Sequence, residues 1–369
     1  MRVGIVGNNL YGQVFTRAIN GTGRAQAVAM APELGEPLEP FASENQLTPY
    51  PSLQDMLASE QLDVVMLGSV TAHHEDDVLE AIRAGAHVLV DRPLALSLPT
   101  CDRIIDAAAA ARRVVIVAHV LQFWPEYVAV REMISRGDLG KPLTVTASRI
   151  SGLLNPAWQA RLLNPAYGFG GLEAHVHDIE YLIGLFGQPV SVQAHGRRTP
   201  DGGWVQVHSL FRFPGGCTAG VEADYGLTHN FPLSMYLRVV GEEGVLLFTF
   251  RGALAASEKA RRRLTWFRPG RDPEQIEVQI GDAYAGLMNH FLDCIAQGTQ
   301  PQFASAPQAR LAVETLLAVS QSAKTTTSRA RVAWPQSIFW ALTSALLSPR
   351  ALSPAVMAVW WRRHPCRTS

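Results

Sequence analysis

The feature that most constrains the fold of this chain is the alternation of short apolar runs with amphipathic segments over residues 1–120. The runs are rich in Val and Ile and apolar at consecutive positions, which is typical of strands buried on both faces. Two intervening segments, Leu53–Glu60 and Asp77–Ala84, have apolar residues at helical spacing. Strands that alternate with helices predict a doubly wound parallel sheet, an α/β fold. The expected strands are Arg2–Val6, Gln26–Ala31, Asp63–Gly68, Ala86–Val90 and Val114–Ala118.

Residues 121–332 have a different pattern, in which several runs alternate partly between apolar and polar positions. Such alternation predicts an α+β domain with a largely antiparallel open sheet. Helices are expected at Pro125–Arg136, Asp282–Ala296 and Ala306–Lys324. The expected strands are Thr144–Arg149, Val190–Arg197, Val205–Phe213, Cys217–Asp224, Met235–Gly241, Gly244–Phe250 and Gln275–Ile280.

The charge balance argues against nucleic acid as a partner. Lys and Arg together number 32, as do Asp and Glu, whereas a nucleic-acid binder needs a basic surplus to displace counterions from phosphates. The four cysteines are far apart and form no C-x-x-C pair, so we expect free thiols. Because the N-terminus runs directly into a predicted strand, no secretion signal is expected there, and the cytoplasm is the expected location.

Residues 333–369 fit neither domain and form an atypical basic, apolar tail. The segment Ile338–Trp361 approaches the ~20 apolar residues of a membrane span. Arg350 interrupts it, with Pro349 and Pro354 beside it, and a charge at bilayer depth is costly. A membrane span is therefore not favoured. A surface-lying amphipathic anchor and an appendage without a function of its own both remain open.

A glycine-bearing turn follows the first predicted strand. Gly7 and Gly12 occupy the first and third glycine places of the G-x-G-x-x-G dinucleotide fingerprint, and Asn9 occupies the second. Asn tolerates left-handed backbone angles better than most residues, so the turn is retained. Its position between a strand and a helix favours a Rossmann dinucleotide site over an ordinary βα turn.

The loop after the second strand bears on the choice between NAD and NADP. The acid that would hydrogen-bond the adenosine ribose is missing from its usual place, and Glu33 is the best remaining candidate. Residues 31–48 contain four acids and no Lys or Arg, so a 2′-phosphate would find no cation there. NAD is favoured, while NADP stays open because Arg24 could reach the site.

Several segments in register resemble the glucose–fructose oxidoreductase and inositol dehydrogenase (Gfo/Idh/MocA) family. Residues 85–95 resemble its G-K-H-V-x-x-E-K-P-L-A signature, and residues 119–127 resemble its segment after the last nucleotide-domain strand. Residues 137–142 are similar to its G-x-L-G-K entry into the second domain. Residues 170–178 resemble its G-G-x-x-x-D-x-x-x-H segment. The resemblance covers roughly residues 1–332.

The resemblance implies a NAD(P)-dependent oxidoreductase that moves hydride between a hydroxyl of a sugar, polyol or related compound and nicotinamide. His177 is the expected base, because imidazole titrates near neutral pH. Glu173 lies four residues earlier, on the same helix face, and is expected to orient it. The residues expected to bind the cofactor are Gly7, Asn9, Leu10, Tyr11, Gly12, Glu33, Ser69, Val70, His74, Asp91 and Arg92.

The substrate pocket is expected to include Gln122, Trp158, His175 and Asp178. His175 also falls on an apolar helical stripe, which favours a buried structural histidine. The two histidines of this segment are separated by one residue and project differently on a helix, so a shared metal is not expected. The expected partners are a small-molecule substrate and a second copy of the chain, joined through the open sheet.

Arg92 is the main departure from the family pattern, because it replaces the expected lysine. A guanidinium stays charged at any working pH, so it can stabilise an alkoxide but cannot relay a proton. Two alternatives therefore stay open beside the dehydrogenase. One is a catalytically impaired nucleotide-binding homologue that acts as a sensor or partner subunit. The other is a lyase or glycosidase that recycles its NAD internally.

Overall fold

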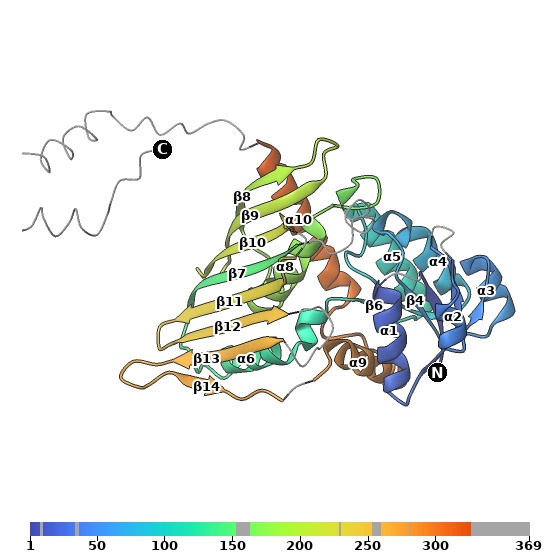
Figure 1. Ribbon diagram of the computed structural model, residues 1–369, viewed down its shortest axis with the longest axis horizontal. Coiled ribbons are helices and arrows are strands. Elements are labelled where there is room, and N and C mark those ends of the chain that lie inside the picture. The colour runs from blue at the N-terminus through green and yellow to red at the C-terminus, as the bar shows by residue number, and fades with distance from the viewer. Residues whose placement is uncertain are drawn as a thin grey trace, which may run out of the picture. The chain divides into compact units, whose positions relative to one another are not determined.

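The computed structural model describes residues 1–7, 10–33, 37–152, 163–228, 230–252, 260–279 and 281–325, without the side chain of Leu10. These residues form two sheets with helices packed on them (Figure 1). Ile280, the last residue of the predicted strand Gln275–Ile280, lies outside the described residues, as does the tail at 333–369. No helix in the described part of the chain combines the length and apolarity that a membrane crossing requires.

The first sheet is parallel, with strand order β3-β2-β1-β4-β5-β6. The prediction of a doubly wound sheet is confirmed, and all five expected strands are present. The additional strand β3 has only two residues, which is too short for a pattern in the sequence. The strands are β1 (Arg2–Val6), β2 (Gln26–Ala31), β3 (Thr48–Pro49), β4 (Val64–Leu67), β5 (His87–Val90) and β6 (Val115–Val117).

Helices cover both faces of this sheet, and each face has its own apolar core. Val64 and Met66 belong to one core and Val65 and Leu67 to the other, which explains why β4 is apolar at four consecutive positions. The helices up to the end of this part of the chain are α1 (Leu10–Gly21), α2 (Phe41–Glu44), α3 (Leu53–Ser59), η1 (Thr71–His73), α4 (His74–Arg83), α5 (Leu98–Ala111) and η2 (Val120–Phe123). The next helix, α6 (Pro125–Ser135), packs in the core of the second sheet.

The second sheet has the order β14-β13-β12-β11-β7-β10-β9-β8. Its neighbours are antiparallel except β7 and β10, which are parallel, so the sheet is largely antiparallel as predicted. Sequence reasoning missed β13, because this strand begins with three consecutive arginines. The strands are β7 (Pro142–Gly152), β8 (Ser191–Arg198), β9 (Trp204–Arg212), β10 (Thr218–Leu227), β11 (Leu233–Gly241), β12 (Val245–Gly252), β13 (Arg261–Phe267) and β14 (Glu274–Ile276).

Two long helices, α8 (Leu172–Phe186) and α10 (Ala306–Thr325), pack on the face of the second sheet that Figure 1 shows toward the first sheet. Helix α9 (Ala283–Gln297) returns to the first sheet and adds Leu287 and Phe291 to its core. The backbone also returns there, since the Val117 amide donates to the Ala304 carbonyl at 2.9 Å. Helix α10 begins two residues after Ala304 and shares a core with α8, so these contacts keep α8 close to the first sheet.

Candidate active site

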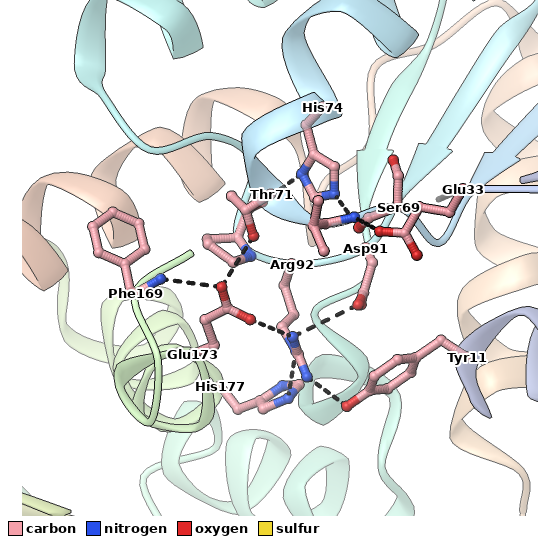
Figure 2. Close-up of polar contacts among 12 residues, drawn as sticks. Tyr11, Glu33, Ser69, Thr71, His74, Asp91, Arg92, Phe169, Glu173 and His177 are labelled. Carbon is pink, nitrogen blue, oxygen red and sulfur yellow. Dashed lines mark hydrogen bonds and ion pairs between the residues drawn. The ribbon is translucent and has the colours of Figure 1, made fainter. Parts of the chain in front are cut away.

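Side chains from elements of the first sheet and from helix α8, which packs on the second sheet, meet at the carboxyl end of β5. Asp91 and Arg92 follow this strand directly, and the Asp91 amide still donates to the Leu67 carbonyl of β4 at 2.8 Å. Helix α8 brings Glu173 and His177 to the same place, and α1 brings Tyr11 (Figure 2). The crevice outside the carboxyl ends of parallel strands is where doubly wound folds bind their ligands.

Arg92 lies at the centre of this cluster and is only 5% exposed. Its Nε donates to Nε2 of His177 at 3.1 Å, and its Nη2 donates to the Tyr11 hydroxyl at 2.5 Å. Its Nη1 faces Glu173 Oε2 at 3.4 Å and Asp91 Oδ2 at 3.6 Å (Figure 2). Burial lowers the pKa of Arg92, but Asp91, Tyr11 and Glu173 outweigh it and raise the pKa overall, so the guanidinium stays charged.

Glu173 is held by groups on three sides. Its Oε1 accepts from the Thr71 hydroxyl at 3.1 Å and from the Phe169 amide at 3.2 Å, and its Oε2 faces Arg92. The backbone can come this close because residue 168 is glycine: a Cβ there would lie 1.8 Å from Glu173 Oε1. Burial raises the pKa of Glu173 to about 7, against the opposing charge of Arg92 and with a further increase from Asp91. A carboxyl group with this pKa can both take up and release a proton near neutral pH.

His177 is a buried, neutral imidazole. Burial lowers its pKa well below the usual value, and the positive charge of Arg92 lowers it further. Because Nε2 accepts a hydrogen bond from Arg92, the ring proton belongs on Nδ1, which has no hydrogen-bond partner among the described residues. The expected contact of Glu173 with His177 is replaced by a link through Arg92, whose guanidinium lies between the two side chains (Figure 2).

Two glycines lie where β1 ends and α1 begins. Gly7 has a φ of +92°, in the left-handed region that glycine adopts without strain. A Cβ on Gly12 would lie 2.1 Å from the Gly7 carbonyl oxygen, so only glycine permits the first turn of α1 to pack so closely. Asn9 and the side chain of Leu10 lie outside the described residues. The two described glycines therefore fit the first and third places of the dinucleotide fingerprint.

The other expected cofactor residues line the same edge of the sheet. The Glu33 carboxylate, after β2, accepts from the Val70 amide, after β4. The Ser69 hydroxyl donates to Asp77 at 2.7 Å. The two ring nitrogens of His74 face the carbonyls of Ser69 and Pro93, at 2.9 and 3.0 Å. Burial lowers the pKa of His74, and a neutral imidazole donates to one of these carbonyls, so the ring lies between the turn after β4 and the turn that carries Arg92.

Three of the residues expected in the substrate pocket have partners elsewhere. Gln122 donates to Glu180 and accepts from Arg131, His175 pairs with the Ser209 hydroxyl, and Asp178 forms an ion pair with Arg149. All three are almost fully buried. Trp158 lies outside the described residues. The structure does not bring Gln122, His175 or Asp178 into the Arg92 cluster, so their substrate contacts stay a prediction that these hydrogen bonds do not support.

Sequence reasoning did not assign Thr71, Phe169 or Arg149 to the site. Phe169 contacts Glu173 through its backbone amide, which every residue except proline has, so the residue type could not indicate this contact. Arg149 did leave a signal, because it falls on the apolar side of an alternating strand after Val145 and Ala147. A charge at such a position predicts a buried partner, which here is Asp178 at 2.9 Å.

A parallel sheet with these two glycines after its first strand, facing a buried cluster of titratable side chains, is typical of dinucleotide-dependent enzymes. Comparisons with known proteins give the family. Residues 1–119 match the GFO/IDH/MocA model described as "Oxidoreductase family, NAD-binding Rossmann fold", and residues 127–247 match the model of the GFO/IDH/MocA C-terminal domain. The chain belongs to this oxidoreductase family, as its resemblance predicted.

Curated relatives match most of the chain. An "Inositol 2-dehydrogenase 3" from Saccharopolyspora erythraea is 24% identical over 310 residues, which cover 81% of this chain and 86% of that protein. A "scyllo-inositol 2-dehydrogenase (NAD(+))" from Bacillus subtilis is 25% identical over 76% of this chain and 77% of its own length. The structure titled aldose-aldose oxidoreductase from Caulobacter crescentus, complexed with glycerol, superposes with a TM-score of 0.76. It is 20% identical and covers 88% of this chain and 97% of its own, which supports the fold.

Proposed function

We propose that this chain is an NAD-dependent oxidoreductase that transfers hydride between a carbinol carbon of a small sugar or polyol and nicotinamide. The observation that carries the proposal is the position of Glu173, His177 and Arg92 at the carboxyl ends of the Rossmann strands. The names of its curated relatives support a polyhydroxylated substrate.

The residues present fit a dinucleotide. The Gly7–Gly12 turn would hold its pyrophosphate, and Glu33 would face the adenosine ribose from the end of β2. The acidic loop after β2 favours NAD over NADP. Bound nicotinamide supplies the acceptor for the hydride, which leaves the hydroxyl proton of the substrate to the protein.

Glu173 is the proton acceptor that the electrostatics favour, in place of the expected His177. A proton added to His177 would put an imidazolium 3.1 Å from the Arg92 guanidinium in a buried site. Burial favours the uncharged form of Glu173 and, with a smaller effect from Asp91, raises its pKa to about 7 against the opposing charge of Arg92, so this carboxyl can take up a proton near neutral pH. We therefore assign proton transfer to Glu173. His177 positions Arg92 through its Nε2.

Arg92 would stabilise negative charge on the substrate oxygen. Its five N–H donors reach four protein groups, and it is charged throughout the working pH range. A fixed positive charge in a buried site lowers the energy of an alkoxide more than it does in water. It does not exchange protons, which is consistent with Glu173 carrying that task.

The proposal is tested by NAD reduction with a panel of sugars and polyols. We expect turnover by the wild-type chain and a loss of at least 100-fold in kcat for Glu173→Gln, in the range that general acid–base catalysis contributes. His177→Ala should also lose most of its activity, because Arg92 would no longer be fixed. Glu132→Gln, at an exposed position of α6, is the matched control. NAD binding without turnover on any compound would contradict the proposal.

The impaired homologue is the second candidate, because Arg92 stands where the family has a lysine and its guanidinium cannot relay a proton. A chain of this kind would bind NAD and show no turnover with the panel. Product formed without net NADH would instead identify internal recycling of the cofactor.

We also propose that the open face of the second sheet pairs with a second copy of the chain. Leu210 on β9 is 64% exposed on that face, whereas its strand neighbours Ser209 and Phe211 are buried beneath it. Leu210→Glu should then lower the molecular mass measured by light scattering to that of a single chain. The free thiols of Cys101, Cys217 and Cys294 support a location in the reducing cytoplasm, which fractionation of the source cells would test.

A further inference from the structure

His119 lies beside the Arg92 cluster at the end of the next strand. In the pairing of β5 with β6, Val90 is opposite Val117, and the Ala118 amide donates to the Val90 carbonyl at 2.9 Å. Two residues beyond Val90 comes Arg92, and two residues beyond Val117 comes His119. Neighbouring strands are about 4.8 Å apart, so the two turns leave the sheet side by side.

Helix α8 lies next to the segment that follows His119. His119 immediately precedes η2, and Gln122 of η2 donates to Glu180 of α8 at 3.0 Å. Glu180 lies about one turn after His177 on the same helix. Charge also connects the three side chains: Arg92 contributes to lowering the pKa of His119, and His119 contributes to lowering the pKa of His177.

The His119 ring is buried without a hydrogen-bond partner. Its side chain is 1% exposed, and neither Nδ1 nor Nε2 has a partner among the described residues. Buried polar groups in folded proteins are nearly always satisfied, so an exception needs an explanation. A ligand that supplies the missing partner is such an explanation, particularly beside a cluster that is proposed to bind one.

The charge state of the ring restricts what this ligand can be. Burial, and then the positive charge of Arg92, lower the pKa of His119 to about 3, so the imidazole is neutral at working pH. A neutral imidazole presents one donor and one acceptor. A hydroxyl group also donates and accepts, and matches it on both counts, whereas a carboxylate only accepts.

We propose that His119 is a substrate-contacting residue whose ring hydrogen-bonds a hydroxyl of the polyhydroxylated substrate near the reacting carbinol. This inference rests on the function proposed above. A dinucleotide bound with its ribose at Glu33 after β2 and its pyrophosphate at Gly7 after β1 would extend its nicotinamide toward the ends of β4 and β5. His119 follows β6, one strand further, next to the helix of the second domain. The substrate is therefore the nearer ligand.

The test replaces His119 by Leu, which has a similar volume and no polar atom, and by Asn and Gln, whose amides mimic Nδ1 and Nε2. With the polyol or sugar that the wild-type chain turns over, we expect His119→Leu to raise KM at least tenfold. The Kd for NAD should stay within twofold, and the Tm of the unliganded protein should not fall, because an unsatisfied buried group has been removed. One amide variant should recover part of the loss. His195→Leu, at an exposed position of β8, is the matched control.

Several outcomes would overturn the inference. An unchanged KM in His119→Leu would show that the ring is only part of the core. A loss confined to NAD affinity would place the contact on the cofactor. If His119→Leu does not fold, an unchanged KM in both amide variants decides against a substrate contact. Failure of the proposed function is distinguishable, because the wild-type chain itself would then show neither turnover nor a substrate-induced rise in Tm.

Discussion

Two buried arginines, Arg149 and Arg92, show how one side-chain type serves two purposes in this chain. Their exposed fractions are nearly equal, at 6% and 5%. Arg149 has one carboxylate partner, with its Nε and Nη2 at 2.9 and 3.4 Å from the two oxygens of Asp178, and its Nη1 donates to the Met235 sulfur at 2.8 Å. Arg92 divides its donors among an imidazole, a phenol and two carboxylates, with its carboxylate contacts at 3.4–3.6 Å.

The partners explain the difference. Arg149 and Asp178 come from β7 and α8, which pack on each other in one apolar core, so a close pair fixes the helix on the sheet. Arg92 joins α1, the end of β5 and α8, and a looser set of contacts can be exchanged when a ligand enters. Since Asp178 directly follows His177, we infer that the Arg149 pair also fixes the rotation of α8 that presents Glu173 and His177 to the site.

The largest expected effect is a difference in the free energy of unfolding between variants that remove a carboxylate partner of each arginine. Asp178→Asn leaves Arg149 buried without its counter-charge and should lower the free energy of unfolding by about 3–5 kcal/mol. Glu173→Gln should lower it by less than about 1 kcal/mol at pH 6, because a carboxyl with a pKa of about 7 is already mostly protonated there. Urea unfolding measures both. Asp138→Asn, in the exposed pair with Arg136, is the control and should change little. Equal losses in the two buried variants would contradict the distinction.

The next effect concerns the donors of Arg92. Lysine has three donors on one nitrogen and does not reach the four partners that the planar guanidinium contacts. We expect Arg92→Lys to lower kcat/KM at least tenfold, about 1.4 kcal/mol in transition-state stabilisation, with NAD affinity little changed. Steady-state kinetics and a separate NAD titration check this. A large gain in activity would show that the arginine had disabled an ancestral proton relay and would favour the impaired homologue.

The smallest effect is a pH dependence. Oxidation needs Glu173 deprotonated, so kcat/KM should rise with pH through the pKa of about 7 and level off above it. From pH 8 to 6.5 the expected fall is about fourfold, which is the change in the deprotonated fraction. In the residual activity of Glu173→Gln, this rise of kcat/KM with pH, the limb of the profile, should be absent. If the limb instead lies below pH 6.5 and survives in Glu173→Gln, His177 is the acceptor, because its pKa is the lowered one.

Periodicity predicted the parallel sheet because buried strands and amphipathic helices differ in residue pattern. It missed β13, where three arginines hide the strand, and β3, which is too short. For the site, the pattern of Glu173 and His177 predicted that they share a helix face, and both do lie beside Arg92. It did not predict that the guanidinium would separate them, because Arg92 is 81 residues from Glu173 in the chain.

The sequence by itself determined the order of most strands and helices, the glycines after β1 and the residue types available for chemistry, because these depend on local spacing and backbone sterics. The tertiary structure decided which buried groups are charged and which have partners. Asp178 is an ion-pair partner, Glu173 a titrating acid, and His119 an imidazole without a hydrogen-bond partner among the described residues. Burial and the distance to Arg92 or Arg149 set these properties, and both arise only when segments far apart in the chain pack together.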